Sequence, residues 1–142
     1  MNWKIQKSNN YNRVEFISSN LTLNAFINRD LKSYPLLLSS RSNNRGLNFE
    51  YEGLTIPDDL DDYDINTLGI IIPRGYIQVG NSLENEYTTI LESVFDEILL
   101  NLSIELSKAH INNSKIGEDW RLKMLEGIDK LKKKIEKGYS LE

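Results

Sequence analysis

Apolar residues at helical spacing in the C-terminal half of the chain constrain the fold most strongly. Between residues 82 and 109 they recur every three or four positions, so a helix would collect them on one face. Asn81 and Ser82 are suited to cap the start of this helix, and the wide apolar face predicts that it is largely buried against a sheet. The stripe consists of Leu83, Tyr87, Ile90, Leu91, Val94, Phe95, Ile98, Leu99, Leu100, Leu102 and Leu106.

A second helix is predicted to begin at Glu118 and Asp119 and to end at Gly138, because glycine readily terminates a helix. Residues 115–142 contain eight basic and six acidic residues, so we interpret the lysine-rich face of this helix as solvated rather than as a nucleic-acid-binding surface. The apolar face carries Trp120, Met124, Leu125, Ile128, Leu131 and Ile135. The opposite face carries Lys123, Lys130, Lys132, Lys133, Lys134 and Lys137.

Short apolar runs separated by turn residues fill the first 80 residues and predict strands. Residues 47–52 alternate most regularly, with Leu47, Phe49 and Tyr51 on one face. Further strands are predicted at residues 14–17, 21–27, 34–38, 68–72 and 76–79. The chain is therefore predicted to be α+β: an antiparallel sheet of about five or six strands from residues 1–80, followed by two long helices packed on one face. Its 142 residues form a single domain, residues 1–142.

An acidic segment follows the alternating strand. Residues 50–64 contain seven carboxylates and no basic residue, while the whole chain has a formal net charge of −4. Like charges packed so closely repel one another, so they are either well solvated or placed against a positive partner. The candidate partner-binding residues are Glu50, Tyr51, Glu52, Asp58, Asp59, Asp61, Asp62, Tyr63 and Asp64.

Part of this segment is similar to the opening of an EF-hand calcium loop, with Asp62, Asp64 and Asn66 at alternate positions. The similarity then fails, because Thr67 occupies the required glycine position and Pro73 the closing acidic position. A metal-dependent enzyme that uses the acidic loop is nevertheless retained as an alternative function. A structural or adaptor module of a larger complex is the other alternative.

No catalytic constellation is evident in the sequence. His110 is the single histidine, and its place near the end of the first long helix favours a structural role. Adjacent acids on one loop do not provide the two opposed carboxylates of a glycosidase. The chain contains no cysteine, which excludes disulfides and thiolate chemistry. We therefore expect no enzymatic activity, no metal and no cofactor.

The first residues contain no apolar core of a signal peptide, and no apolar run approaches the ~20 residues that span a bilayer. We therefore expect a cytoplasmic protein that binds neither membrane nor nucleic acid.

The small size, the acidity and the segment at residues 58–64 together resemble the small immunity proteins of bacterial contact-dependent growth inhibition and related polymorphic toxin systems. The resemblance implies a cytoplasmic inhibitor that binds and neutralises a cognate basic toxin domain, often a nuclease. In that case the seven carboxylates would take the place of substrate phosphates, and Tyr51 and Tyr63 would anchor the interface.

Overall fold

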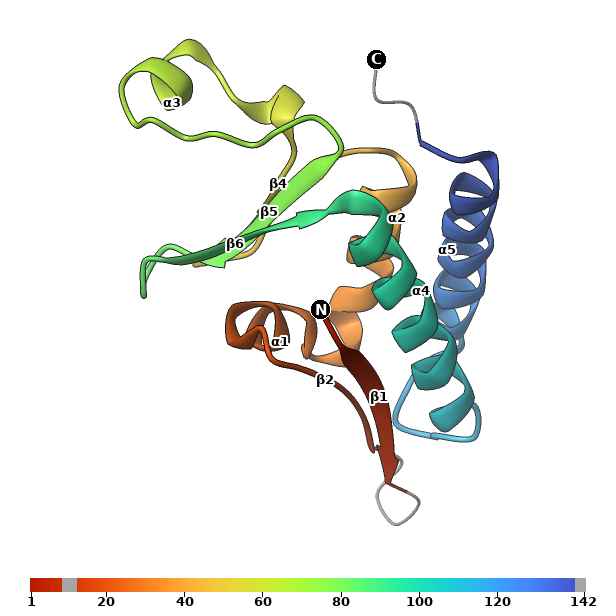
Figure 1. The fold of residues 1–142 in the computed structure, drawn as a ribbon. Helices are drawn as coiled ribbons and strands as arrows, with labels where there is room; N and C mark the ends of the chain where they lie inside the picture. The colour runs from red at the N-terminus through yellow and green to blue at the C-terminus, as the bar shows by residue number, and fades with distance from the viewer. Residues whose placement is uncertain (9–12, 140–142) are drawn as a thin grey trace.

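The computed structural model describes residues 1–8 and 13–139 of the chain. Within these residues the fold is α+β: six antiparallel strands in two sheets precede two long C-terminal helices that pack together and against strands (Figure 1). The predicted fold class, the number of strands and the two final helices are thus confirmed. Among the described residues, no helix is both long and apolar enough to cross a membrane.

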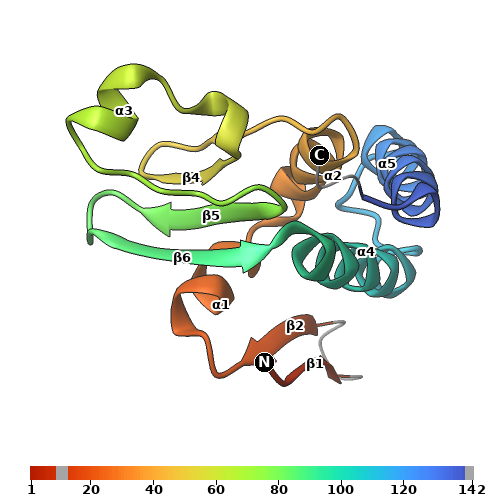
Figure 2. The same ribbon diagram turned by 45° about the horizontal axis from the view of Figure 1, so that its top comes forward.

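The strands form two separate sheets, so the prediction of one sheet was wrong. A hairpin of β1 (Trp3–Ser8) and β2 (Arg13–Ser18) makes the first sheet. The second has the order β3-β4-β5-β6, formed by β3 (Leu47–Asn48), β4 (Glu52–Thr55), β5 (Tyr76–Asn81) and β6 (Glu86–Leu91). Helices separate the two sheets in space, as Figure 2 shows.

Two segments predicted as strands are helices: α1 (Leu21–Ile27) and α2 (Tyr34–Ser42), which follows the short 3-10 helix η1 (Leu31–Ser33). Short apolar runs fit a buried strand and a buried helix equally well, and local capping decides between them here. The Asn20 side chain accepts a hydrogen bond from the Leu23 amide at 3.0 Å and so starts α1. Pro35 lies in the first turn of α2, where its missing N–H costs nothing.

Residues 68–72 do not form the predicted buried strand. They run without regular structure, with Leu68 and Ile71 exposed and Ile72 buried. The prediction that a helix begins near residue 82 was also wrong, because residues 86–91 form β6 and pair with β5. The Asn81 side chain accepts hydrogen bonds from the amides of residues 83 and 84, which stabilises the turn between these two strands.

The long helices are α4 (Glu92–Ala109) and α5 (Glu118–Lys137). His110 caps the end of α4, and Gly138 follows α5 with a φ of 86°, as the sequence predicted. Of the residues assigned to the apolar faces, several are instead exposed: Leu83, Tyr87, Leu91 and Leu125. Helix α5 approaches α2 closely at Gly127, where a Cβ atom would lie 2.8 Å from the Cβ of Leu38.

A buried ionic cluster joins α2, α4 and α5. Arg41 and Asp96 are both 0% exposed, and the Arg41 Nε donates to Asp96 Oδ1 at 2.6 Å. Arg41 Nη2 also donates to Glu92 at 2.9 Å. Asp96 Oδ2 accepts further hydrogen bonds from Lys134 Nζ at 2.9 Å and from the Tyr139 hydroxyl at 2.7 Å. One carboxylate therefore connects three helices and the residue that follows Gly138.

The cluster also shifts the ionisation of its members. Burial, together with the charge of Arg41, lowers the pKa of Lys134 below its ordinary value. Burial, and then the hydrogen bond to Asp96, raises the pKa of Tyr139. Burial opposes the charge of Arg41, but the hydrogen bond and charge of Asp96 outweigh this, and the pKa of Arg41 is raised. The arginine therefore stays charged, balanced by Asp96 and Glu92.

Asp96→Asn should destabilise the protein by about 3–5 kcal/mol, because it leaves the buried guanidinium of Arg41 without its main counter-charge. Urea denaturation monitored by circular dichroism would measure the loss. Asp129→Asn is the matched control, since it removes the same charge from the exposed Lys133–Asp129 pair on α5. Equal stabilities of the two variants would contradict a structural role of the cluster.

Candidate functional site

The structure distributes the predicted partner-binding residues over three places. Glu50 and Tyr51 lie in the connection between β3 and β4, and Glu52 begins β4. Asp58 and Asp59 belong to the 3-10 helix η2 (Pro57–Asp59). The remaining four, Asp61, Asp62, Tyr63 and Asp64, lie at or within the short helix α3 (Asp62–Asn66).

We call residues 57–75, which connect β4 to β5, the acidic arm. In both views α3 lies at the end of the molecule opposite α5 (Figures 1 and 2). The backbone hydrogen bonds around α3 are local: Ile65 N donates to Asp61 O at 3.1 Å, and Thr67 N donates to Tyr63 O at 2.9 Å. Helix α3 is therefore a projecting element held by short-range backbone hydrogen bonds, whereas the end of the arm is anchored to the fold, where the Glu92 amide donates to Gly75 O at 2.9 Å and Ile72 is buried.

Some of the aspartates in the arm have a local structural role. Asp61 Oδ1 accepts a hydrogen bond from the Asp64 amide at 2.8 Å, and Asp64 Oδ2 accepts one from the Asp61 amide at 3.1 Å. This reciprocal capping box starts α3, where negative charge also favours the helix dipole. Asp59 similarly accepts from the Ile56 amide at 3.3 Å. Within the described part of the chain, Asp58 and Asp62 form no such hydrogen bond.

Exposed apolar side chains accompany the aspartates of the arm. Tyr63 is 60% exposed, Ile65 49%, Leu68 56% and Ile71 78%. Apart from Tyr63, these residues were not among the predicted site residues; Leu68 and Ile71 were assigned to a buried strand at residues 68–72, and Ile65 was assigned no role. Carboxylates beside exposed apolar anchors can both attract a cationic partner and bury surface against it.

Glu52 is less accessible to a binding partner than Glu50 and Tyr51. Its carboxylate is partly buried and accepts a hydrogen bond from Arg29 Nη1 at 3.0 Å. The guanidinium of Arg29 lies 3.6 Å from the centre of the Phe49 ring and 5.3 Å from that of Phe26. Glu52 therefore takes part in an internal ionic and aromatic contact.

Glu50 and Tyr51 border a hollow of about 330 Å³ on the outer face of the four-stranded sheet. Tyr87 of β6 and Gln78 of β5 also line it. We call it the tyrosine hollow, because Tyr51 and Tyr87 are each about half exposed.

A larger hollow of about 700 Å³ lies between the base of the arm and α5. Asp58 and Glu92 line it together with basic residues, namely Arg74, Lys130, Lys133, Lys134 and Lys137. Three of these lysines are paired with acids, and Lys134 belongs to the buried ionic cluster. The interpretation of the lysine face as solvated is therefore wrong for Lys134.

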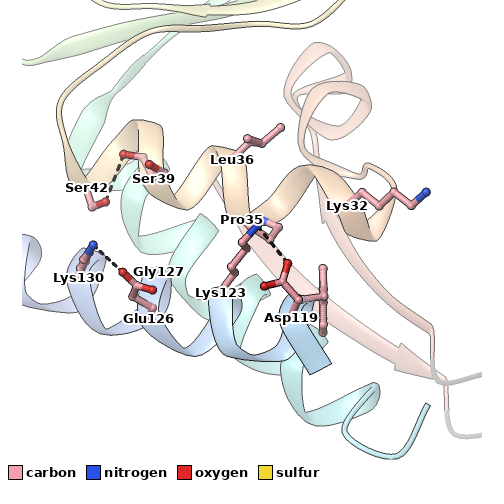
Figure 3. A pocket seen from close by; sticks show the side chains of 11 residues that line it. Lys32, Pro35, Leu36, Ser39, Ser42, Asp119, Lys123, Glu126, Gly127 and Lys130 are labelled. Atoms are coloured by element: carbon pink, nitrogen blue, oxygen red, sulfur yellow. Dashed lines mark hydrogen bonds and ion pairs between the residues drawn. The ribbon is translucent and has the colours of Figure 1, made fainter. Parts of the chain in front are cut away.

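A third hollow, of about 530 Å³, follows the groove between α2 and α5 (Figure 3). Pro35, Leu36 and Trp120 supply its apolar lining. The charges on its rim pair with one another, Lys123 with Asp119 at 3.1 Å and Lys130 with Glu126 at 2.8 Å. The rim therefore offers little net charge to select a ligand.

His110 has the structural position that the sequence predicted. It caps α4 and packs edge-on against Trp120, with ring centres 6.4 Å apart, and burial lowers its pKa. Trp120 in turn donates from its indole N–H to Leu31 O at 2.6 Å.

The segment that is similar to a calcium loop folds as helix α3. Across residues 1–8 and 13–139, no group of three or more histidine, cysteine, aspartate or glutamate side chains is placed to hold a metal ion.

Comparison with known proteins found no matching family model, no matching curated protein and no matching solved structure.

Asp61→Ala should unfold α3, because loss of the N-cap costs about 1 kcal/mol in a helix with little other support. Backbone Cα chemical shifts of residues 63–66 would move toward random-coil values. Asp62→Ala is the control, since it removes an equal charge within the same helix without removing the cap. Retention of helical shifts in Asp61→Ala would show that the capping box does not maintain α3.

Proposed function

We propose that this protein is an immunity protein that binds and neutralises a cognate basic toxin domain, as in bacterial contact-dependent growth inhibition and related polymorphic toxin systems. The acidic arm, which combines aspartates with exposed apolar side chains, is the observation that carries the proposal. The protein would act in the cytoplasm by occupying the toxin, without catalysis. A nuclease is the class of toxin that fits best, because its active site binds phosphates through basic residues.

The distribution of charge supports a cationic partner. Residues 57–75 contain five aspartates and one arginine, a formal net charge of −4. The whole chain has 21 acidic and 17 basic residues, also −4, so the remainder of the protein is balanced. A field concentrated at one end of a molecule accelerates and orients the approach of an oppositely charged partner.

The exposed apolar residues of the arm can supply binding affinity, to which solvated charges alone contribute little. Solvated ion pairs contribute little to affinity, whereas aromatic and aliphatic side chains that become buried at the centre of an interface contribute most of it. Tyr63 lies directly between Asp62 and Asp64, and Ile65 and Leu68 follow in the same segment. An interface centred on α3 would therefore have an apolar core and an acidic rim.

The proposal would be tested first by a pull-down at low salt from a lysate of the source cells, with bound proteins eluted by salt and identified by mass spectrometry. We expect one basic protein, whose toxic or nuclease activity falls to zero at an equimolar amount of this protein. Capture of no basic protein, or full activity of the captured protein in the presence of excess inhibitor, would overturn the proposal.

Changing Asp61, Asp62 and Asp64 together to Asn should weaken binding of the partner by several kcal/mol, since close interfacial charge pairs couple by about 1.5–7 kcal/mol. The fold should persist, because an asparagine side-chain oxygen accepts the same capping hydrogen bonds. Titration calorimetry would measure the affinity and thermal unfolding the stability.

The matched control changes Asp119 and Asp129 to Asn and Glu126 to Gln. It removes three negative charges from the exposed face of α5, so the net charge of the two variants is the same. Equal affinities of the two triple variants would remove the arm from the mechanism.

A further inference from the structure

The tyrosine hollow lies over two glycines that are neighbours in the sheet. Gly53 of β4 pairs with Gly80 of β5, while Asn48 pairs with Gly53 and Tyr87 pairs with Gly80. These four residues form one row across all four strands. The strand neighbours Leu54 and Val79 are buried, so the row faces the opposite, outer side of the sheet.

The ring of Tyr87 lies directly over Gly80. A Cβ atom added to Gly80 would collide with the Tyr87 side chain, so the absence of a side chain at residue 80 is what allows the ring to rest there. The ring remains half exposed and forms one side of the hollow.

Tyr51 lies on a connection that the backbone holds in place. Its carbonyl oxygen accepts hydrogen bonds from Ser82 N at 2.7 Å and from Ser82 Oγ at 3.1 Å. Phe49 N donates to Glu52 O at 2.8 Å within the same connection. Two exposed aromatic rings therefore border one hollow on anchored backbone, so little backbone freedom is lost when a ligand binds.

The charges around the hollow favour a cation. Glu50 and Glu52 line it, and its other lining residues are uncharged: Asn48, Phe49, Tyr51, Gly53, Thr55, Gln78, Gly80, Ser82 and Tyr87. The carboxylate of Glu52 is paired with Arg29. Glu50 is exposed and forms no salt bridge within the described residues, so its negative charge is available to a ligand.

We propose that the tyrosine hollow receives an arginine side chain of the protein partner; the inference rests on the proposed function, since that partner is the toxin domain. A guanidinium stacks on tyrosine rings and donates to Glu50 and to the side-chain oxygens of Asn48 and Gln78. The protein already uses this chemistry internally, where Arg29 stacks on Phe49 and donates to Glu52. Arginine suits the site better than lysine because its planar group offers several fixed donors.

An NMR titration at low salt with N-acetyl-arginine methylamide tests the hollow without the partner. We expect saturable shifts of the amides of Gly53, Gly80 and Ser82. The citrulline analogue, which has the same shape without the charge, should produce no saturable shift. Equal responses to the two probes, or arginine shifts centred on residues 57–75 instead of the hollow, would overturn the proposal.

Three variants locate the binding site. Tyr51→Ala, Tyr87→Ala and Glu50→Gln should each weaken arginine binding about two- to fivefold, the usual effect of one exposed cation–π or charged contact. Glu50→Gln changes an exposed side chain and should not disturb the fold. Tyr63→Ala is the control, because it removes a tyrosine of similar exposure from the arm. Unchanged affinity in all three hollow variants would overturn the proposal.

Binding of the captured partner to these variants distinguishes failure of this inference from failure of the proposed function. If both hold, the partner binds more weakly to Tyr51→Ala and Tyr87→Ala as well as to the triple Asn variant of the arm. Loss of binding in the arm variant alone would overturn the role of the hollow and leave the proposed function standing. Unchanged binding of the partner to both sets of variants would overturn the roles of the hollow and of the arm, whereas capture of no basic protein, or no inhibition of the captured one, would overturn the proposed function itself.

Discussion

The arrangement of the helices depends on the buried pair of Arg41 and Asp96. A charged pair taken fully out of water loses its hydration, and this cost is offset only if the geometry and the surrounding hydrogen bonds are good. Here Asp96 also accepts from Lys134 and Tyr139, and Arg41 also donates to Glu92. These hydrogen bonds join α2, α4 and α5 in one network, although the buried Arg41 Nη1 has no hydrogen-bond partner within the described residues. The close approach of Gly127 to Leu38 lies in the same α2–α5 contact.

This arrangement leaves two surfaces in and beside the four-stranded sheet uncovered by helices. Helix α1 packs on the inner face of β5 and β6, while the long helices lie beyond one end of the strands (Figure 2). The outer face of the sheet and the acidic arm are therefore open to solvent. The proposed functions of the arm and of the tyrosine hollow both rely on this openness, and the base of the arm borders the ionic cluster, since Asp58 and Lys134 line the same hollow.

The sequence predicted those features that local chemistry determines. The second long helix ends at Gly138 as predicted, and His110 lies at the end of the first, because helix termini depend on neighbouring residues. The sequence-based predictions were wrong where contacts between residues far apart in the chain determine the structure. Residues 86–91 match helical spacing but pair with β5, and residues 68–72 look like a core strand yet lie largely exposed.

Nothing near Arg41 in the sequence reveals its partner Asp96, 55 residues away. Asp96, however, interrupts the apolar run between Phe95 and Ile98. A carboxylate within a stripe predicted to be buried indicates that it has a buried positive partner, so the sequence did contain a sign of the ionic cluster. Of the candidate site, the acidic residues were visible in the sequence, whereas their division among the arm, the hollow and the Arg29 contact follows from tertiary structure.

The local character of the hydrogen bonds of α3 has an evolutionary consequence. No residue of α3 is buried, so substitutions within this helix change the shape and charge of the arm while the core under the sheet is untouched. Under the proposed function, recognition and stability could therefore vary independently. A lineage could change the partner that it recognises at the exposed positions of α3, and the scaffold that displays them would be inherited unchanged.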